Sequence, residues 1–172
     1  MNTYVYLFLL EIKTLARFGK LNLPYFINIK VVKMDKITVK ALVKAPIEKV
    51  WQAYNNPEDI MQWNTASADW HTVNSKNDLS VGGQFSHRME AKDGSMGFDF
   101  AGTYTEIVPF KKIAYEFGGR TAEIQFQALE DGAICVQISF DPEHEFPIEQ
   151  QQAGWQAILN SFANYVETVK AA

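Results

Sequence analysis

The chain has 172 residues, a formal net charge of −4 and a single cysteine, Cys135. This length suits one domain with a substantial core. The acidic balance and the scattered lysines argue against a protein that binds the nucleic-acid backbone, which needs a basic stripe. One cysteine excludes an intramolecular disulfide, so we expect a cytoplasmic protein.

The first 33 residues are more apolar and basic than the rest of the chain. The apolar run of residues 4–10 is too short to span a bilayer, and no basic residue precedes it, so neither a transmembrane segment nor a secretory signal is expected. Residues 12–20 are compatible with a weak helix at a membrane surface. The interpretation that we favour is an N-terminal extension, residues 1–33, whose role the sequence does not define, with Met34 as a candidate true start.

Regular patterns begin at Asp35. Residues 36–45, "KITVKALVKA", alternate apolar and polar side chains and predict a half-buried strand. Two short helices should follow, because Pro46 suits the first turn of a helix and Asn55-Asn56-Pro57 ends that helix and opens a second one through Met61. We therefore expect one strand and then two short helices.

Six more segments between residues 69 and 140 alternate with the two-residue period of strands. Asp93-Gly94 and Asp131-Gly132 supply turn signals between neighbouring segments, as in antiparallel hairpins. Gly102 interrupts an apolar face and predicts a β-bulge. These features predict a curved antiparallel sheet.

The last segment predicts one long helix, residues 148–170, which begins after Pro147. Trp155, Leu159, Phe162 and Val166 recur at spacings of three and four and form an apolar stripe. Helices segregated from an antiparallel sheet define an α+β fold. A curved sheet around a long helix leaves a space that is a default ligand site.

The glycine-rich stretch of residues 82–104, "GGQFSHRMEAKDGSMGFDFAGTY", is not a phosphate loop. Gly82 and Gly83 lead into a strand rather than a helix, and no Gly-Lys-Ser/Thr follows. No histidine pair or CxxC occurs at metal-ligand spacing, and no G-x-S-x-G surrounds a serine. We therefore predict no metal site, no cofactor and no catalytic nucleophile.

Several blocks of the sequence carry a family resemblance: "APIEKVWQAYNNPEDIMQWN" (residues 45–64), "ADWHT", "DLSVGGQFSHRMEAKDGSMGFDFAGTY" and "GWQAILNSFANYVE". In this order they resemble the activator of heat-shock protein 90 ATPase homologues. These belong to the helix-grip, START-like (Bet v 1-like) superfamily, which includes birch-pollen allergens, lipid-transfer domains and polyketide cyclases. The resemblance covers residues 34–172. It implies a single ligand-binding domain in which an antiparallel sheet grips the C-terminal helix around a cavity.

The candidate cavity wall follows from strand alternation and the helix stripe. We expect it to be formed by Phe85, His87, Met89, Phe98, Phe100, Tyr115, Phe126, Trp155 and Leu159. His87 alternates with apolar neighbours and has two readings. It either orients a ligand or acts as a general base in the cavity, or it is a strand histidine hydrogen-bonded to a neighbour.

The function that we favour is binding of a small apolar or aromatic molecule, without established catalysis. The first alternative is a module that contacts a chaperone. The second is an enzyme of the cyclase or hydrolase kind that uses His87 or a cavity carboxylate. Nucleic acid is not an expected partner, and a homodimer is left open.

Overall fold

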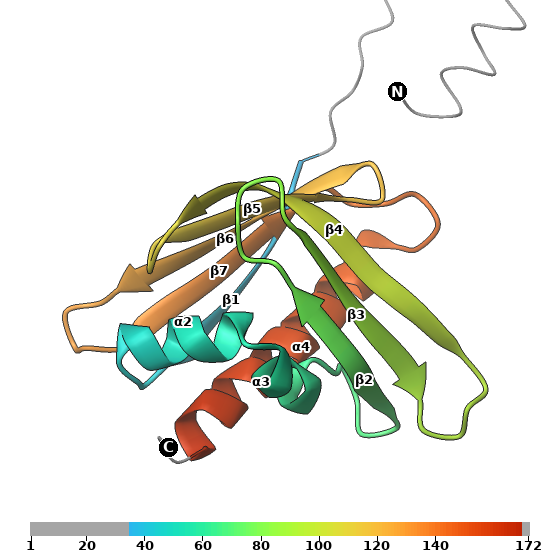
Figure 1. Cartoon of the computed structure of the whole chain (residues 1–172), viewed down its shortest axis with the longest axis horizontal. Coiled ribbons are helices and arrows are strands. Elements are labelled where there is room, and N and C mark those ends of the chain that lie inside the picture. The colour runs from blue at the N-terminus through green and yellow to red at the C-terminus, as the bar shows by residue number, and fades with distance from the viewer. Residues whose placement is uncertain (1–34, 170–172) are drawn as a thin grey trace, which may run out of the picture. The chain divides into compact units, whose positions relative to one another are not determined.

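The computed structural model describes residues 35–169 (Figure 1). The two readings of residues 1–33 lie outside this part of the chain. The elements in order are β1 (Ile37–Val43), α2 (Ile47–Asn55), α3 (Pro57–Trp63), β2 (Trp70–Asn77), β3 (Gln84–Ala91), β4 (Gly97–Val108), β5 (Lys112–Phe117), β6 (Arg120–Ala128), β7 (Ile134–Phe140) and α4 (Ile148–Thr168). The predicted order of elements is confirmed, although α3 extends to Trp63 and α4 ends two residues before Lys170.

Seven antiparallel strands form one sheet in the order β1-β7-β6-β5-β4-β3-β2. The sheet curls, and α4 runs across its concave side, while α2 and α3 lie near the C-terminal end of α4 (Figure 1). The strands that follow one another along the chain pair as neighbours from β2 to β7, and β1 then pairs with β7. The helix-grip architecture is confirmed.

Two β-bulges change which side chains face the helix. One lies between Thr72 and Asn74 in β2, and the other lies between Tyr104 and Glu106 in β4. The bulge predicted at Gly102 is wrong, because β4 pairs with β3 without a shift there. A side chain at Gly102 would instead meet the Phe85 ring, since an added Cβ would lie 2.6 Å from Phe85 Cζ. This glycine lets an aromatic ring lie against the backbone of the sheet.

The two halves of α4 differ in burial. All of its buried residues lie in the second half: Leu159, Phe162, Ala163 and Val166. The Phe162 ring meets the rings of Tyr54 and Trp63 edge-on, at centroid distances of 5.3 and 5.0 Å. The aromatic side chains of α2 and α3 thus close the core over this half of the helix.

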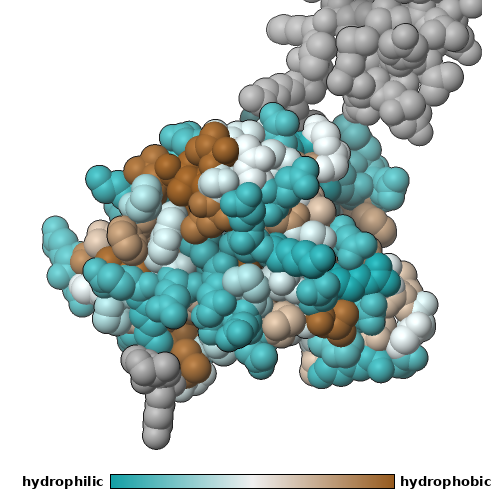
Figure 2. Space-filling view, viewed as in Figure 1, coloured by the Kyte–Doolittle hydropathy of each residue, from teal (hydrophilic) through white to brown (hydrophobic). Residues whose placement is uncertain are grey.

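The face shown in Figure 2 is mostly hydrophilic, and its apolar side chains form separate groups rather than one continuous patch. No helix within residues 35–169 is long and apolar enough to cross a membrane.

Candidate functional site

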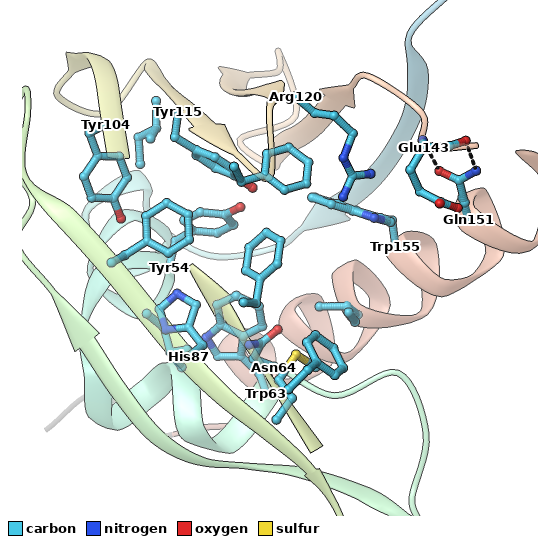
Figure 3. A pocket seen from close by; sticks show the side chains of 18 of the residues that line it. Tyr54, Trp63, Asn64, His87, Tyr104, Tyr115, Arg120, Glu143, Gln151 and Trp155 are labelled. Carbon is cyan, nitrogen blue, oxygen red and sulfur yellow. Dashed lines mark hydrogen bonds between the residues drawn. The ribbon is translucent and has the colours of Figure 1, made fainter. Parts of the chain in front are cut away.

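A cavity of about 300 Å³ lies between the sheet and the first half of α4. Its wall is mostly aromatic and aliphatic, with a few polar groups (Figure 3). The lining residues are Tyr54, Ile60, Trp63, Asn64, Phe85, His87, Met89, Phe98, Phe100, Tyr104, Ile113, Tyr115, Phe117, Arg120, Glu143, Phe146, Gln151, Trp155 and Ile158. This combination of an apolar wall with few polar groups is typical of a small-molecule site.

Seven of the nine side chains proposed from the sequence lie in this wall: Phe85, His87, Met89, Phe98, Phe100, Tyr115 and Trp155. Phe126 and Leu159 are buried elsewhere in the core. The Phe126 ring is covered by Trp51 and Tyr54 of α2, each at a centroid distance of 5.3 Å. Ile158 lines the cavity where Leu159 was expected, because consecutive residues point about 100° apart around a helix.

Trp155 lines the wall from α4, together with Gln151 and Ile158. Its ring stacks on Phe140 with centroids 4.1 Å apart and an interplanar angle of 17°. The rings of Phe100 and Phe117 approach it at 5.8 Å. Because Phe140 of β7 holds one face of the indole, the ring is fixed at the boundary between core and cavity.

His87 is hydrogen-bonded to a neighbouring strand residue, as one of the two readings expected, and it also lies in the cavity wall. It lines the cavity and is only 8% exposed. Its Nδ1 lies 2.9 Å from the Ser75 hydroxyl, while its Nε2 has no hydrogen-bond partner among residues 35–169. Burial lowers the pKa of His87 from 6.5 to about 4, because desolvation disfavours the imidazolium. The ring is therefore neutral at physiological pH.

Tyrosine hydroxyls supply further polar groups in the cavity. The hydroxyls of Tyr54 and Tyr115 make no hydrogen bond within the described chain, and no fully buried side-chain nitrogen or oxygen there lacks a partner. These hydroxyls are therefore accessible from the cavity, toward which they point in Figure 3. Tyr104 differs, since its hydroxyl donates to Asn77 Oδ1 at 2.8 Å. Desolvation raises the pKa of all three phenols, which stay neutral.

His87 and Tyr104 lie at one end of the cavity. The charged side chains Arg120 and Glu143 lie at the opposite end, beside Gln151 and Trp155 (Figure 3). This end is partly exposed to solvent, and Phe146 beside it is 55% exposed. The Arg120 guanidinium lies 4.5 Å from the centroid of the Phe117 ring. We call this end the mouth and define it by Arg120, Glu143, Phe146 and Gln151.

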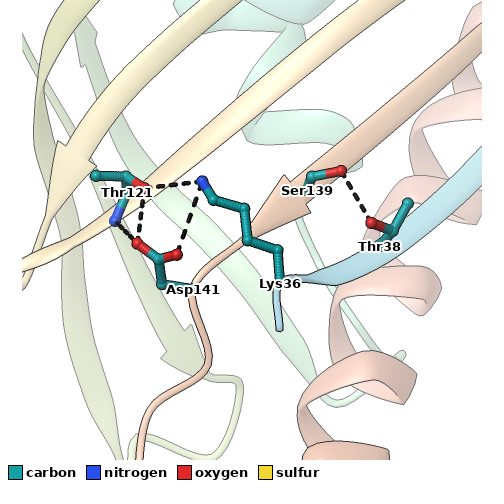
Figure 4. A network of polar contacts seen from close by, with 5 residues as sticks. All are labelled: Lys36, Thr38, Thr121, Ser139 and Asp141. Carbon is teal, nitrogen blue, oxygen red and sulfur yellow. Dashed lines mark hydrogen bonds and ion pairs between the residues drawn. The ribbon is translucent and has the colours of Figure 1, made fainter. Parts of the chain in front are cut away.

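Polar contacts fix the backbone beside the mouth (Figure 4). Asp141 Oδ2 accepts hydrogen bonds from the Thr121 backbone N–H at 2.9 Å and from the Thr121 hydroxyl at 2.6 Å. Lys36 Nζ donates to the same hydroxyl at 2.8 Å and lies 3.7 Å from Asp141 Oδ1. The start of β6 and the end of β7 are thereby joined one residue after Arg120 and two residues before Glu143.

The site does not bring together an acid–base pair. Within the described part of the chain, Glu143 is the one carboxylate in the wall, and it lies at the opposite end from His87 (Figure 3). Within residues 35–169, no group of three or more His, Cys, Asp or Glu side chains is arranged to hold a metal ion. What the arrangement offers is an apolar space with hydrogen-bonding groups inside and charge at the mouth.

Sequence reasoning missed all four residues of the mouth and the partner of His87. Arg120 shares its strand face with Ala122 and Ile124, so the alternation of β6 contained the signal for it. Strand alternation contained no such signal for Ser75. The bulge after Thr72 places Thr72 and Ser75 on the same buried face although they are three residues apart, which the two-residue period of a strand does not predict. Tyr54 and Asn64 enter the cavity from the ends of helices, where no strand period applies.

Residues 44–167 match the family model described as activator of Hsp90 ATPase homolog 1-like protein. The chain belongs to this family. Family and fold together support a ligand-binding or Hsp90-related module. Among curated proteins, none matches the sequence.

Solved structures of relatives agree with the family assignment. An AHSA1-like protein from Aeromonas hydrophila is 44% identical over 80% of this chain and 99% of its own, with a TM-score of 0.72. A protein from Cytophaga hutchinsonii is 49% identical over 77% of this chain and 92% of its own, with a TM-score of 0.67. An Aha1 dimer from Colwellia psychrerythraea shares the fold at 18% identity, covering 80% of this chain and all of its own, with a TM-score of 0.63.

Proposed function

We propose that this AHSA1-like chain binds a small apolar or aromatic molecule in the cavity between the sheet and α4. The observation that carries the proposal is an apolar cavity of about 300 Å³ that is lined by polar groups of Tyr54, Tyr115 and His87. The two phenol hydroxyls and the His87 Nε2 have no hydrogen-bond partner among residues 35–169. A ligand that enters the cavity would cover these polar groups, and covering a polar group without a partner costs free energy. A ligand with a matching hydrogen-bonding group would avoid this cost. An aromatic ligand would in addition pack against the rings of the wall.

The neutral dye N-phenyl-1-naphthylamine tests this proposal, since its fluorescence rises in apolar surroundings. We expect saturable binding to the full-length protein. Ile158→Trp, which extends a side chain of the wall into the cavity, should weaken binding at least about tenfold. The matched control is Ile148→Trp at the exposed start of the same helix, which should bind as the wild type does.

The proposal is overturned if the wild-type protein does not enhance the dye's fluorescence. It is equally overturned if a folded Ile158→Trp variant, checked by circular dichroism, binds as tightly as Ile148→Trp. Native mass spectrometry of the protein from its own host then serves to identify the natural ligand.

The family assignment favours chaperone interaction as the second candidate. Its test is whether the purified protein changes the ATP hydrolysis rate of an Hsp90-type chaperone, and an unchanged rate together with no binding by calorimetry would remove it. The homodimer stays a prediction and is tested by analytical ultracentrifugation. The cytoplasmic location and the domain boundary at Met34 also stay predictions.

A further inference from the structure

Among the residues that the structure describes, only Arg120 and Glu143 bring charge to the cavity wall. The other titratable wall groups are phenols, which remain protonated, and His87, which burial holds neutral. A charged part of any bound molecule would therefore meet fixed charge only at the mouth.

Arg120 has no ion pair and no hydrogen bond with any other residue between 35 and 169. Its guanidinium is instead held above the Phe117 ring. Arg88 provides the contrast, because its guanidinium lies 2.8 Å from Glu90 Oε1 and 3.6 Å from Asp99 Oδ2 on the outer surface of the sheet. Arg120 thus presents an unused fork of N–H donors that matches a carboxylate.

Glu143 does not neutralise Arg120 by pairing with it. Its Oε2 accepts the Glu145 backbone N–H at 2.7 Å, and its Oε1 accepts the Phe146 backbone N–H at 2.8 Å. Gln151 braces the same loop by donating to the backbone carbonyls of Glu143 at 3.1 Å and Phe146 at 2.8 Å. The carboxylate of Glu143 is therefore occupied in holding the loop of the mouth.

We propose that Arg120 is the recognition site for an acidic group and that the ligand is an amphipathic carboxylate, whose apolar body fills the cavity. This inference rests on the proposed binding function and narrows it to one chemical class. The aromatic wall would take the apolar part, while the guanidinium would form charge-assisted hydrogen bonds with the carboxylate. The contacts of Thr121 with Asp141 hold the backbone next to Arg120.

The test compares 2-naphthoate with 2-naphthalenemethanol, which share the ring system and differ in charge, by isothermal titration calorimetry on the full-length protein. We expect wild-type protein to prefer the acid by about tenfold, as hydrogen bonds to a charged group warrant. Arg120→Met keeps the apolar stem over Phe117 and should remove this preference without weakening binding of the alcohol. Arg88→Met is the matched control, because it lowers the net charge equally and should leave the preference intact.

Salt dependence of the wild-type protein gives a second readout that needs no variant. Raising the ionic strength should weaken binding of 2-naphthoate and leave the alcohol unaffected. Equal affinity for the two compounds, a preference that survives Arg120→Met, or salt-independent binding of the acid would each overturn the inference while the broader function stands. Failure of both compounds to bind would overturn both proposals.

Discussion

The two halves of α4 face the same curved sheet but perform different tasks. The second half buries Leu159, Phe162, Ala163 and Val166, and α2 and α3 close over it. The first half buries no residue fully and lines the cavity through Gln151, Trp155 and Ile158. Similar alternating strands therefore support a packed core at one end and an open cavity at the other, and the difference comes from which helices cover them.

The largest expected effect lies at the packed end. Phe162→Ala should lower the free energy of unfolding by about 3–5 kcal/mol, because it removes a fully buried ring and leaves a void between α2, α3 and the sheet. Urea denaturation measures this loss. Phe146→Ala at the mouth is the control and should change stability by less than about 0.5 kcal/mol, since that ring is 55% exposed. A loss below about 1 kcal/mol at Phe162 would contradict the packed end as described.

Gly102→Ala should affect the boundary between the two ends. An added methyl group would lie 2.5 Å from the Glu116 backbone oxygen and 2.6 Å from Phe85 Cζ, so the Phe85 ring must move toward the cavity. We expect a loss of about 1–3 kcal/mol in stability. Gly94→Ala at an exposed turn is not a neutral control, because Gly94 has a φ of +75°. Ala101→Gly serves as the comparison instead, because Ala101 is next to Gly102 in the chain and is exposed. Unchanged melting of Gly102→Ala would show that Phe85 does not need this glycine.

The pH dependence of stability tests the burial of His87. The folded-state pKa is about 4 against 6.5 in the unfolded chain, so the unfolded chain binds the proton first as the pH falls. The stability of the folded protein that depends on a neutral His87 is therefore fully present above about pH 6.5. It is lost as the pH falls toward about 4. Between about pH 7 and pH 5 the loss should be about 2 kcal/mol. His87→Gln should remove that part of the pH slope, and identical slopes for both proteins would contradict a buried neutral imidazole.

The smallest expected effect is a change in ligand affinity when His87 is replaced. His87→Phe should preserve or strengthen binding of naphthalene, because it removes a polar group from an apolar space. It should weaken binding of 2-acetylnaphthalene, which carries a carbonyl acceptor, by about 1 kcal/mol or about fivefold. Calorimetric titration of both compounds measures the difference. If neither affinity changes, or if the variant unfolds, His87 has a structural role only.

Much of the fold could be predicted from the sequence because alternation and helical spacing record which side chains are buried. The strand patterns of Phe85, His87 and Met89 predicted one face of β3, and these residues are all buried. The predictions failed where a β-bulge breaks the two-residue period of a strand, or where another element covers a side chain. The bulge in β2 concealed Ser75, and α2 covers Phe126, which a single strand pattern has no means of showing.

The site was harder to predict than the fold because a cavity is the space that side chains from several elements leave unfilled. Trp155 and Leu159 belong to one apolar stripe in the sequence, yet one borders the cavity and the other is core. The distinction depends on the position of α2 and α3 against α4, which is a tertiary property. The alternation of β6 contained a signal for Arg120 that was not used, and its lack of an ion pair with the other residues between 35 and 169 was visible only in three dimensions.

The separation of α4 into two halves also bears on how such a protein diversifies. Side chains that border a cavity have fewer packing neighbours than those of a filled core, so their replacement is less costly to folding. Substitutions at Ile158 or Phe98 can therefore accumulate while Phe162 and Val166 keep the domain assembled. One chain architecture can in this way change the shape and polarity of its cavity by drift, without first having to regain its stability.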